Sequence, residues 1–95
     1  MTARSWHLVS YDVRDDRRLR RTARLLEGYG ERVQYSVFRC RLTRKGLERM
    51  RWELARVMEA EDSLLIIPIC AGCSRGIHES MDRAWRAEPP TYRVV

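Results

Sequence analysis

The 95-residue sequence lacks a long uninterrupted apolar run, since the longest one, from Leu64 to Ala71, is broken by Pro68. A helix that spans a membrane needs about 20 consecutive apolar residues, so we expect none here. The first residues also lack the apolar core of a secretory signal. These two absences favour a soluble cytoplasmic protein that has no membrane contact.

Cysteine is scarce, and its count of three is odd, which argues against a disulfide framework. Cys70 and Cys73 form a single Cys-x-x-Cys motif, which is half of a zinc site or the core of a redox pair. Cys40 and His78 could complete a set of four ligands, but their spacing fits no common zinc motif. We therefore expect free thiols in the core or in a turn, and the motif alone leaves zinc binding and redox chemistry open.

The sequence contains one lysine, Lys45, against 18 arginines, and its formal net charge is +6. The positive charge is one-sided, because residues 1–50 carry a net charge of +7 and residues 51–95 carry −1. Arginine presents a planar fork of donors that matches phosphate oxygens. This distribution favours a nucleic-acid partner, and a merely solvated basic face is the alternative.

Hydrophobic periodicity predicts a regular order of strands and helices. Asp15 and Asp16 stand at the first turn of the first expected helix, and Thr43 caps the second. In chain order we expect a strand over 6–11, a helix from 15 to about 28, either one bent strand or two short strands over 33–42, a helix over 43–60, a strand over 63–70, a short helix over 74–88 and a terminal strand over 91–95.

This order matches the split βαβ plan of a ferredoxin-like α+β fold, with an antiparallel sheet and both helices on one face. Residues 1–95 would form one domain, in which 74–95 is a C-terminal extension with a possible edge strand. Pro68 places its own strand at a sheet edge or a bulge. The open face of the sheet would need a cover, which a symmetric homodimer would supply.

Asp12 directly follows the first expected strand. Turn formation is the ordinary role of an aspartate at such a position. In a dimer, two copies of Asp12 could instead converge near the axis and bind Mg²⁺ or Mn²⁺, which prefer oxygen ligands. Such an ion can activate water against a phosphodiester.

Other polar and aromatic residues give weaker signals. A serine nucleophile needs a neighbouring base, and neither His7 nor His78 lies in a companion motif, so we expect no triad at Ser36. Phe38 could stack on a nucleic-acid base, but a lone aromatic in a strand is more often part of the core. We expect the remaining large aromatics to be packing groups, namely Trp52, Trp85 and Tyr92.

The first expected helix places Arg17, Arg20, Arg21 and Arg24 on one side, because three- and four-residue spacings share a helix face. Four like charges repel one another, so a polyanion that neutralises them would account for the pattern. The strand segment would extend this basic surface. The full set of residues expected to bind nucleic acid is Arg14, Arg17, Arg18, Arg20, Arg21, Arg24, Arg39 and Arg41.

Three segments together resemble the CRISPR-associated protein two family: Tyr11-Asp12-Val13, the arginine-rich helix, and Gly30 to Phe38 followed by Cys40. The similarity runs through Cys70 and is poorer after Cys73. It implies a ferredoxin-like homodimer that takes part in CRISPR adaptation, the acquisition of spacers. In this role the dimer bridges two dimers of the CRISPR integrase subunit and holds prespacer duplex DNA on a basic surface.

The resemblance also implies an alternative, since some members of the family are reported as metal-dependent endonucleases that cleave single-stranded RNA or double-stranded DNA. Arg14 departs from the Pro or Thr of many relatives and adds a cation that could weaken metal binding. An RNA-binding module of the RRM type lacks its aromatic signature here. The site implied for the nuclease has Asp12 as ligand of Mg²⁺ or Mn²⁺, surrounded by Tyr11, Arg21, Arg32, Ser36 and Phe38.

Overall fold

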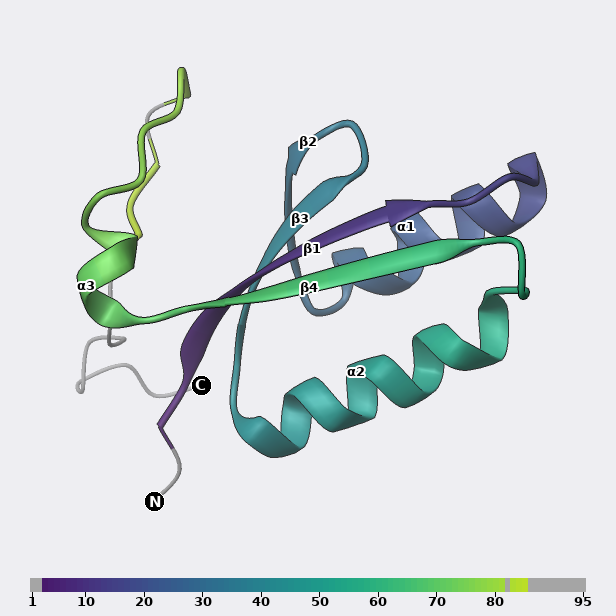
Figure 1. The fold of residues 1–95 in the computed structure, drawn as a ribbon, viewed down its shortest axis with the longest axis horizontal. Coiled ribbons are helices and arrows are strands. Elements are labelled where there is room, and N and C mark those ends of the chain that lie inside the picture. Colours follow the sequence, from purple (N-terminus) through teal and green to yellow (C-terminus); the bar gives the residue numbers. More distant parts are fainter. Residues whose placement is uncertain (1–2, 82, 86–95) are drawn as a thin grey trace.

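The computed structural model describes residues 3–81 and 83–85. Its first six elements follow the order strand, helix, two strands, helix, strand, which confirms the predicted α+β class (Figure 1). A single helical turn follows the last strand. The elements are β1 (Ser5–Asp12), α1 (Asp16–Glu27), β2 (Gly30–Gln34), β3 (Val37–Leu42), α2 (Arg44–Val57), β4 (Ser63–Ile69) and α3 (Ala71–Ser74).

Four strands form one antiparallel sheet in the order β2-β3-β1-β4. The strand β4 therefore lies at an edge, as Pro68 predicts. Side chains alternate between the two faces of a strand. Val9 lies opposite Phe38 on β3 and Ile66 on β4, on the covered face, whereas Leu8 lies opposite Ile67, which is 45% exposed on the other face. The sheet thus has one covered and one open face.

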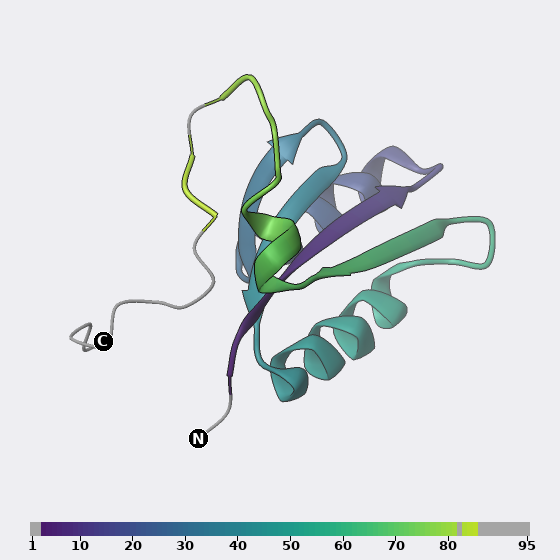
Figure 2. The same cartoon turned by 60° about the vertical axis from the view of Figure 1, so that its left-hand side comes forward.

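Both long helices pack against the covered face, as predicted from the sequence. The buried apolar residues of α1 and α2 belong to the same core cluster as side chains of one parity from β1 and β3. Figure 2 shows α3 and the segment after it beyond the end of β4, away from α1 and α2. The main contributors to this core are Val9, Tyr11, Leu26, Phe38, Cys40, Met50 and Leu54.

The segment 33–42 forms two strands, which decides between the two alternatives left by the sequence. A turn at Tyr35 and Ser36 joins β2 to β3, and the register shifts between Arg32 and Gln34. At the start of β2, a Cβ atom on Gly30 would lie 2.0 Å from the Arg39 carbonyl oxygen. The close approach of the two strands therefore requires glycine at this position.

The helix predicted over 74–88 is wrong for residues 75–81 and 83–85, which contain no helix. Helical structure instead begins at Ala71 and ends at Ser74. Ile77 and Trp85 lie along the open face of the sheet, where they line a hollow with Leu8. The strand predicted over 91–95 lies outside the described residues.

The helix caps are as expected, since Asp15 accepts from the Arg18 amide at 2.9 Å and Thr43 from the Gly46 amide at 3.0 Å.

The packing role expected of Trp52 is wrong, because this side chain is 60% exposed on the outer side of α2. It escapes burial because the core-facing positions of α2 are taken by other apolar residues. Within the two described ranges, no helix has the length and apolar character to cross a bilayer.

Candidate nucleic-acid interface and the Asp12 site

Asp12 is the last residue of β1, and it lies opposite Ser63 of β4. Strand alternation places it on the same face as Leu8 and Ser10, which is the open face of the sheet. Its side chain is 63% exposed. Arg14 Nη2 lies 3.6 Å from Asp12 Oδ2, so the Arg14 cation is placed beside this carboxylate.

Four of the residues implied around Asp12 come together at the hairpin end of the sheet. The Tyr11 amide donates to the Ser36 carbonyl oxygen at 3.2 Å. The Tyr11 and Phe38 rings pack with centroids 6.2 Å apart, and the Arg32 guanidinium lies 5.1 Å from the Phe38 ring centroid. Both rings are buried, so these aromatic residues support the site from within the core rather than offer a stacking surface.

Burial raises the pKa of the Tyr11 hydroxyl, and the neighbouring Arg32 guanidinium partly opposes this rise. Tyr11 is therefore a neutral phenol at ordinary pH. Arg21, the remaining residue implied for the site, is exposed on α1. It belongs with the helix arginines rather than with the Tyr11 and Phe38 pair.

A single chain does not fit a magnesium or manganese site. Among the described residues, no three His, Cys, Asp or Glu side chains group closely enough to hold a metal ion. Asp12 supplies one carboxylate, and Arg14 competes for it. Ions of this type are normally bound through more than one oxygen ligand, so a second copy of Asp12 would have to come from a partner subunit.

The four arginines predicted on one side of α1 are all exposed, as the spacing indicates: Arg17, Arg20, Arg21 and Arg24. Within residues 3–81 and 83–85, none of the four forms an ion pair. On a helix their spacing covers about 10 Å along the axis. This row of unpaired guanidinium groups forms a concentrated positive surface on α1.

Arg18 differs from its neighbours because it is engaged within the chain. Its Nε atom donates to Asp62 Oδ2 at 2.9 Å, and its Nη2 atom donates to Glu61 Oε2 at 2.8 Å. Asp62 also accepts from the Arg14 amide at 3.0 Å and the Glu59 amide at 2.9 Å. This carboxylate therefore ties the turn before β4 to the start of α1.

The sequence analysis missed Asp62. The hydrogen bond from Arg18, followed by that from the Glu59 amide, holds the pKa of the Asp62 carboxyl far below its usual range. The only local signal is that Asp62 lies three residues after Glu59, whose amide donates to it. The partners Arg14 and Arg18 lie 48 and 44 residues away in sequence, which no local pattern reveals.

Arg39 is buried, and its cation is satisfied inside the protein. Its Nε atom donates to Glu31 Oε1 at 2.8 Å, and its guanidinium carbon lies 4.6 Å from the ring centroids of both Trp6 and Trp85. The expected packing role of Trp85 is confirmed, with its ring centroid 5.0 Å from that of Trp6. The Arg41 guanidinium carbon also lies 5.5 Å from the Trp6 ring centroid. These contacts give Arg39 and Arg41 a structural role at the end of the sheet.

The open face of the sheet carries a hollow of about 340 Å³. Apolar side chains of all four strands form its floor, and Ile77, His78, Glu79 and Trp85 form one wall. Leu65 and Ile67 on β4 are 57% and 45% exposed on this same face. Adjacent exposed apolar side chains of this size are typical of an interaction surface.

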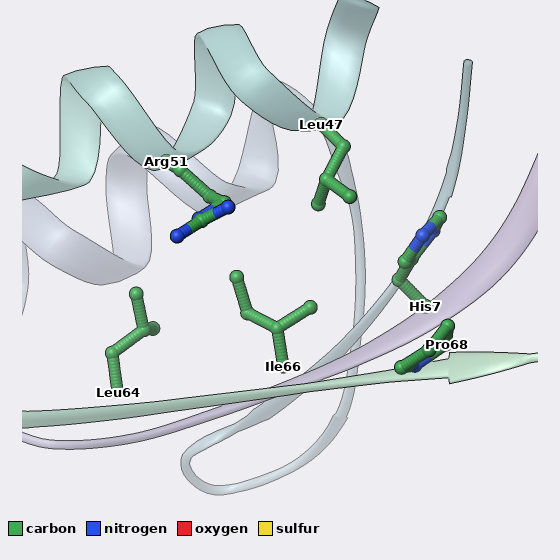
Figure 3. A pocket seen from close by; sticks show the side chains of 6 residues that line it. All are labelled: His7, Leu47, Arg51, Leu64, Ile66 and Pro68. Atoms are coloured by element: carbon green, nitrogen blue, oxygen red, sulfur yellow. The ribbon is translucent and has the colours of Figure 1, made fainter. Parts of the chain in front are cut away.

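A second hollow, of about 360 Å³, lies between α2 and the edge strand β4 (Figure 3). None of the residues predicted for the Asp12 site or the basic surface lines it. Its side chains come from the covered side of the sheet and from α2. They are His7, Leu47, Arg51, Leu64, Ile66 and Pro68.

Comparison with known proteins agrees with the resemblance seen in the sequence. A family model described as CRISPR associated protein Cas2 matches residues 5–77. CRISPR-associated endoribonuclease Cas2 3 of Synechocystis sp. is 44% identical over 64 residues, which is 66% of this chain and 70% of that protein. CRISPR-associated endoribonuclease Cas2 of Thermus thermophilus is 38% identical over 79 residues, 83% of this chain and 78% of that one.

Solved structures also resemble this chain. The crystal structure of Streptococcus pyogenes Cas2 matches with a TM-score of 0.70 and 30% identity, covering 78% of this chain and 96% of that chain. A chain of a partial Cas6-RT-Cas1–Cas2 complex shares the fold at a TM-score of 0.72 and 22% identity, covering 96% of this chain and 99% of that one. The chain described here therefore belongs to the CRISPR-associated protein Cas2 family.

Proposed function

We propose that this chain is a subunit of CRISPR adaptation that binds prespacer duplex DNA as a homodimer and bridges dimers of the CRISPR integrase. The observation that carries the DNA-binding part is the row of exposed, unpaired arginines on α1. Guanidinium groups release counterions when they neutralise phosphates, and this supplies sequence-independent affinity for duplex DNA. Such a subunit has no need to read base edges.

The homodimer part of the proposal draws on the open face of the sheet. Its exposed apolar residues Leu65 and Ile67 and its hollow need a partner surface. A twofold axis there would double the basic surface. It would also bring two copies of Asp12 toward the axis, because Asp12 lies on that same face.

The DNA-binding proposal is tested by replacing Arg17, Arg20, Arg21 and Arg24 with glutamine. Affinity for a short duplex, measured by fluorescence anisotropy at several salt concentrations, should fall. The slope of log affinity against log salt should flatten by about 0.9 for each phosphate that the variant no longer neutralises. A matched control removes the same number of charges from α2, at Arg44, Lys45, Arg49 and Arg56.

The α2 variant should keep most of the salt slope. Equal reductions in affinity for the two variants would refute a binding surface on α1, because net charge alone would then explain the affinity. Spacer acquisition in cells provides the second readout. It should fail with the α1 variant and persist with Asp12→Ala, because in this proposal Asp12 does not contact DNA or perform chemistry.

A metal-dependent endonuclease is the second candidate, and the names of the relatives favour it, since they are called endoribonucleases. In this candidate two Asp12 carboxylates of a dimer would bind Mg²⁺ or Mn²⁺, and Arg14 beside each would weaken the ion's hold. Cleavage of single-stranded RNA and of duplex DNA should be assayed with and without the metal. Activity that disappears on chelation and is absent from Asp12→Asn supports this candidate, and equal activity of that variant refutes it.

A further inference from the structure

The motif Cys70-Ala71-Gly72-Cys73 plays no part in the DNA-binding site, yet it forms a defined arrangement of two exposed thiols. Cys70 directly follows β4, and Cys73 lies one helical turn later, in α3. The Cys73 amide donates to Cys70 Sγ at 3.3 Å. The two side chains therefore lie next to each other, and the backbone holds the sulfur of the first.

The two thiols have opposite acidities. The Cys73 amide, and then the Cys73 thiol, donate to Cys70 Sγ and lower the pKa of Cys70. The same contact raises the pKa of Cys73, since its proton is shared with the neighbouring sulfur. This asymmetry is what separates an attacking thiolate from a resolving thiol in a dithiol pair.

The space beside Cys70 is open to a reactant. Ala71 and Gly72, which separate the two cysteines, are small and exposed. A Cβ atom on Gly72 would lie 4.0 Å from Cys70 Sγ and 3.9 Å from Arg75 Nη2. The missing side chain thus leaves open space beside the sulfur.

Two alternatives fit this arrangement less well. A structural zinc ion takes four ligands, and within the described part of the chain no third Cys, His, Asp or Glu joins the pair. A purely structural role would bury the thiols, as it does for Cys40, where burial raises the pKa to about 11. Both sulfurs of the motif are exposed instead.

We propose that Cys70 and Cys73 form a redox-active dithiol that reduces a low-molecular-weight disulfide and closes to an intramolecular disulfide. Cys70 is the attacking thiol and Cys73 the resolving thiol. This activity is separate from DNA binding. It does not depend on the proposed function, because neither cysteine belongs to the α1 arginine surface.

The exchange proceeds in two balanced steps. The Cys70 thiolate attacks one sulfur of the disulfide RSSR, which breaks the S–S bond, forms a Cys70–SR mixed disulfide and releases RS⁻. The Cys73 sulfur, after losing its proton, then attacks Cys70 Sγ and displaces the second RS⁻. The dithiol loses two electrons and two protons in total, and RSSR gains them as two RSH molecules.

The test uses oxidised glutathione as the probe and intact-protein mass spectrometry as the readout. The reduced wild-type protein should lose two hydrogens without gaining glutathione, and peptide mapping should place the new disulfide between Cys70 and Cys73. Cys73→Ser should stop at a stable mixed disulfide on Cys70. Cys70→Ser should form adducts severalfold more slowly than Cys73→Ser, because in Cys73→Ser the backbone amide at position 73 still donates to Cys70 Sγ and lowers its pKa.

The buried thiol supplies the internal control, since Cys40 should stay unmodified in all folded variants. Equal rates in Cys70→Ser and Cys73→Ser would overturn the assignment of the two roles. The proposal as a whole fails if the wild-type protein accumulates glutathione adducts without closing a disulfide, or if the reduced protein binds zinc tightly through these thiols. Duplex binding by Cys70→Ser should equal that of the wild type, which separates this result from any failure of the DNA-binding proposal.

Discussion

Arg14 Nη2 and Asp12 Oδ2 lie 3.6 Å apart at the edge of the open sheet face, with both side chains about two-thirds exposed, at 67% and 63%. Water screens such a pair, so it contributes little to folding stability. Its effect on a phosphate ligand is larger. The Asp12 carboxylate offsets the charge of Arg14, which lies two residues before α1. The carboxylate also repels the phosphates of duplex DNA.

We therefore predict that Asp12→Asn tightens duplex DNA binding severalfold. The slope of log affinity against log salt should steepen by up to about 0.9, the value for one additional neutralised phosphate. Glu48→Gln is the matched control, because Glu48 pairs with Arg44 in the same exposed manner on α2. An equal increase in affinity from both substitutions would mean that net charge, and not the position of Asp12, sets the affinity.

A second prediction concerns the acid stability that Asp62 provides. Because the folded-state pKa of its carboxyl is lowered, the unfolded chain binds its proton more readily than the folded protein does. The resulting stability is complete above the unfolded pKa of about 3.9 and is lost as the pH falls further. Asp62→Asn should lower the thermal midpoint by several degrees at pH 7 and should flatten the loss of stability below pH 4.

Thermal unfolding followed by circular dichroism between pH 3 and pH 7 measures this effect. Glu61→Gln is the control, since Glu61 is 62% exposed and pairs with the same Arg18. It should change the midpoint by little, because surface pairs contribute little to stability. If the thermal midpoint of Asp62→Asn depended on pH as that of the wild type does, the link from this carboxylate to α1 would not stabilise the fold.

The sequence predicts the fold well wherever one local pattern dominates. The 3.6-residue period of Leu19, Thr22, Ala23 and Leu26 and the cap at Asp15 mark α1 without any tertiary information. Residues 75–81 mislead for the opposite reason. The helical spacing of Ile77 and Met81 is present, but Ile77 instead lines the hollow on the open sheet face. Burial against a sheet outweighs a weak local preference.

A third prediction addresses Gly30, whose missing side chain permits the pairing of β2 with β3. An added Cβ atom would lie 2.0 Å from the Arg39 carbonyl oxygen and 2.8 Å from Cys40 Sγ. Backbone atoms cannot move aside cheaply, so Gly30→Ala should destabilise the protein by about 1–3 kcal/mol, the usual range for overpacking. Amide hydrogen exchange should rise first in β2 and β3.

Gly76→Ala is the matched control, because its Cβ atom would meet only the Cys73 carbonyl oxygen, at 3.6 Å. That distance is an ordinary contact, so the free energy of unfolding should stay within about 0.5 kcal/mol of the wild type. If Gly30→Ala were as well tolerated, the strands would have to lie farther apart than the structure places them.

The candidate site is less predictable from sequence than the fold. The spacing of Arg17, Arg20, Arg21 and Arg24 identifies an exposed row, because helix geometry alone determines it. It gives no hint that Arg18, inside the same run, is engaged with Asp62, or that Arg39 is enclosed by Trp6 and Trp85. Those contacts depend on residues more than thirty positions away, which only the folded chain brings together.

The last prediction tests whether the open sheet face forms the homodimer. Ile67 is 45% exposed on that face, opposite Leu8 in the register of β1 and β4. Ile67→Lys places a charge where two sheets would meet, and an unpaired charge is expensive to bury. Since the side chain lies on the surface of the monomer, the variant should fold and remain monomeric.

Sedimentation equilibrium measures this outcome, and Trp52→Lys is the control, since Trp52 is 60% exposed on α2, which covers the opposite side of the sheet. Trp52→Lys should stay dimeric. A monomeric Ile67→Lys should also bind duplex DNA with a flatter salt dependence, because a monomer presents only one row of α1 arginines. A dimeric Ile67→Lys would place the dimer contact elsewhere, and the two copies of Asp12 would then have no reason to meet.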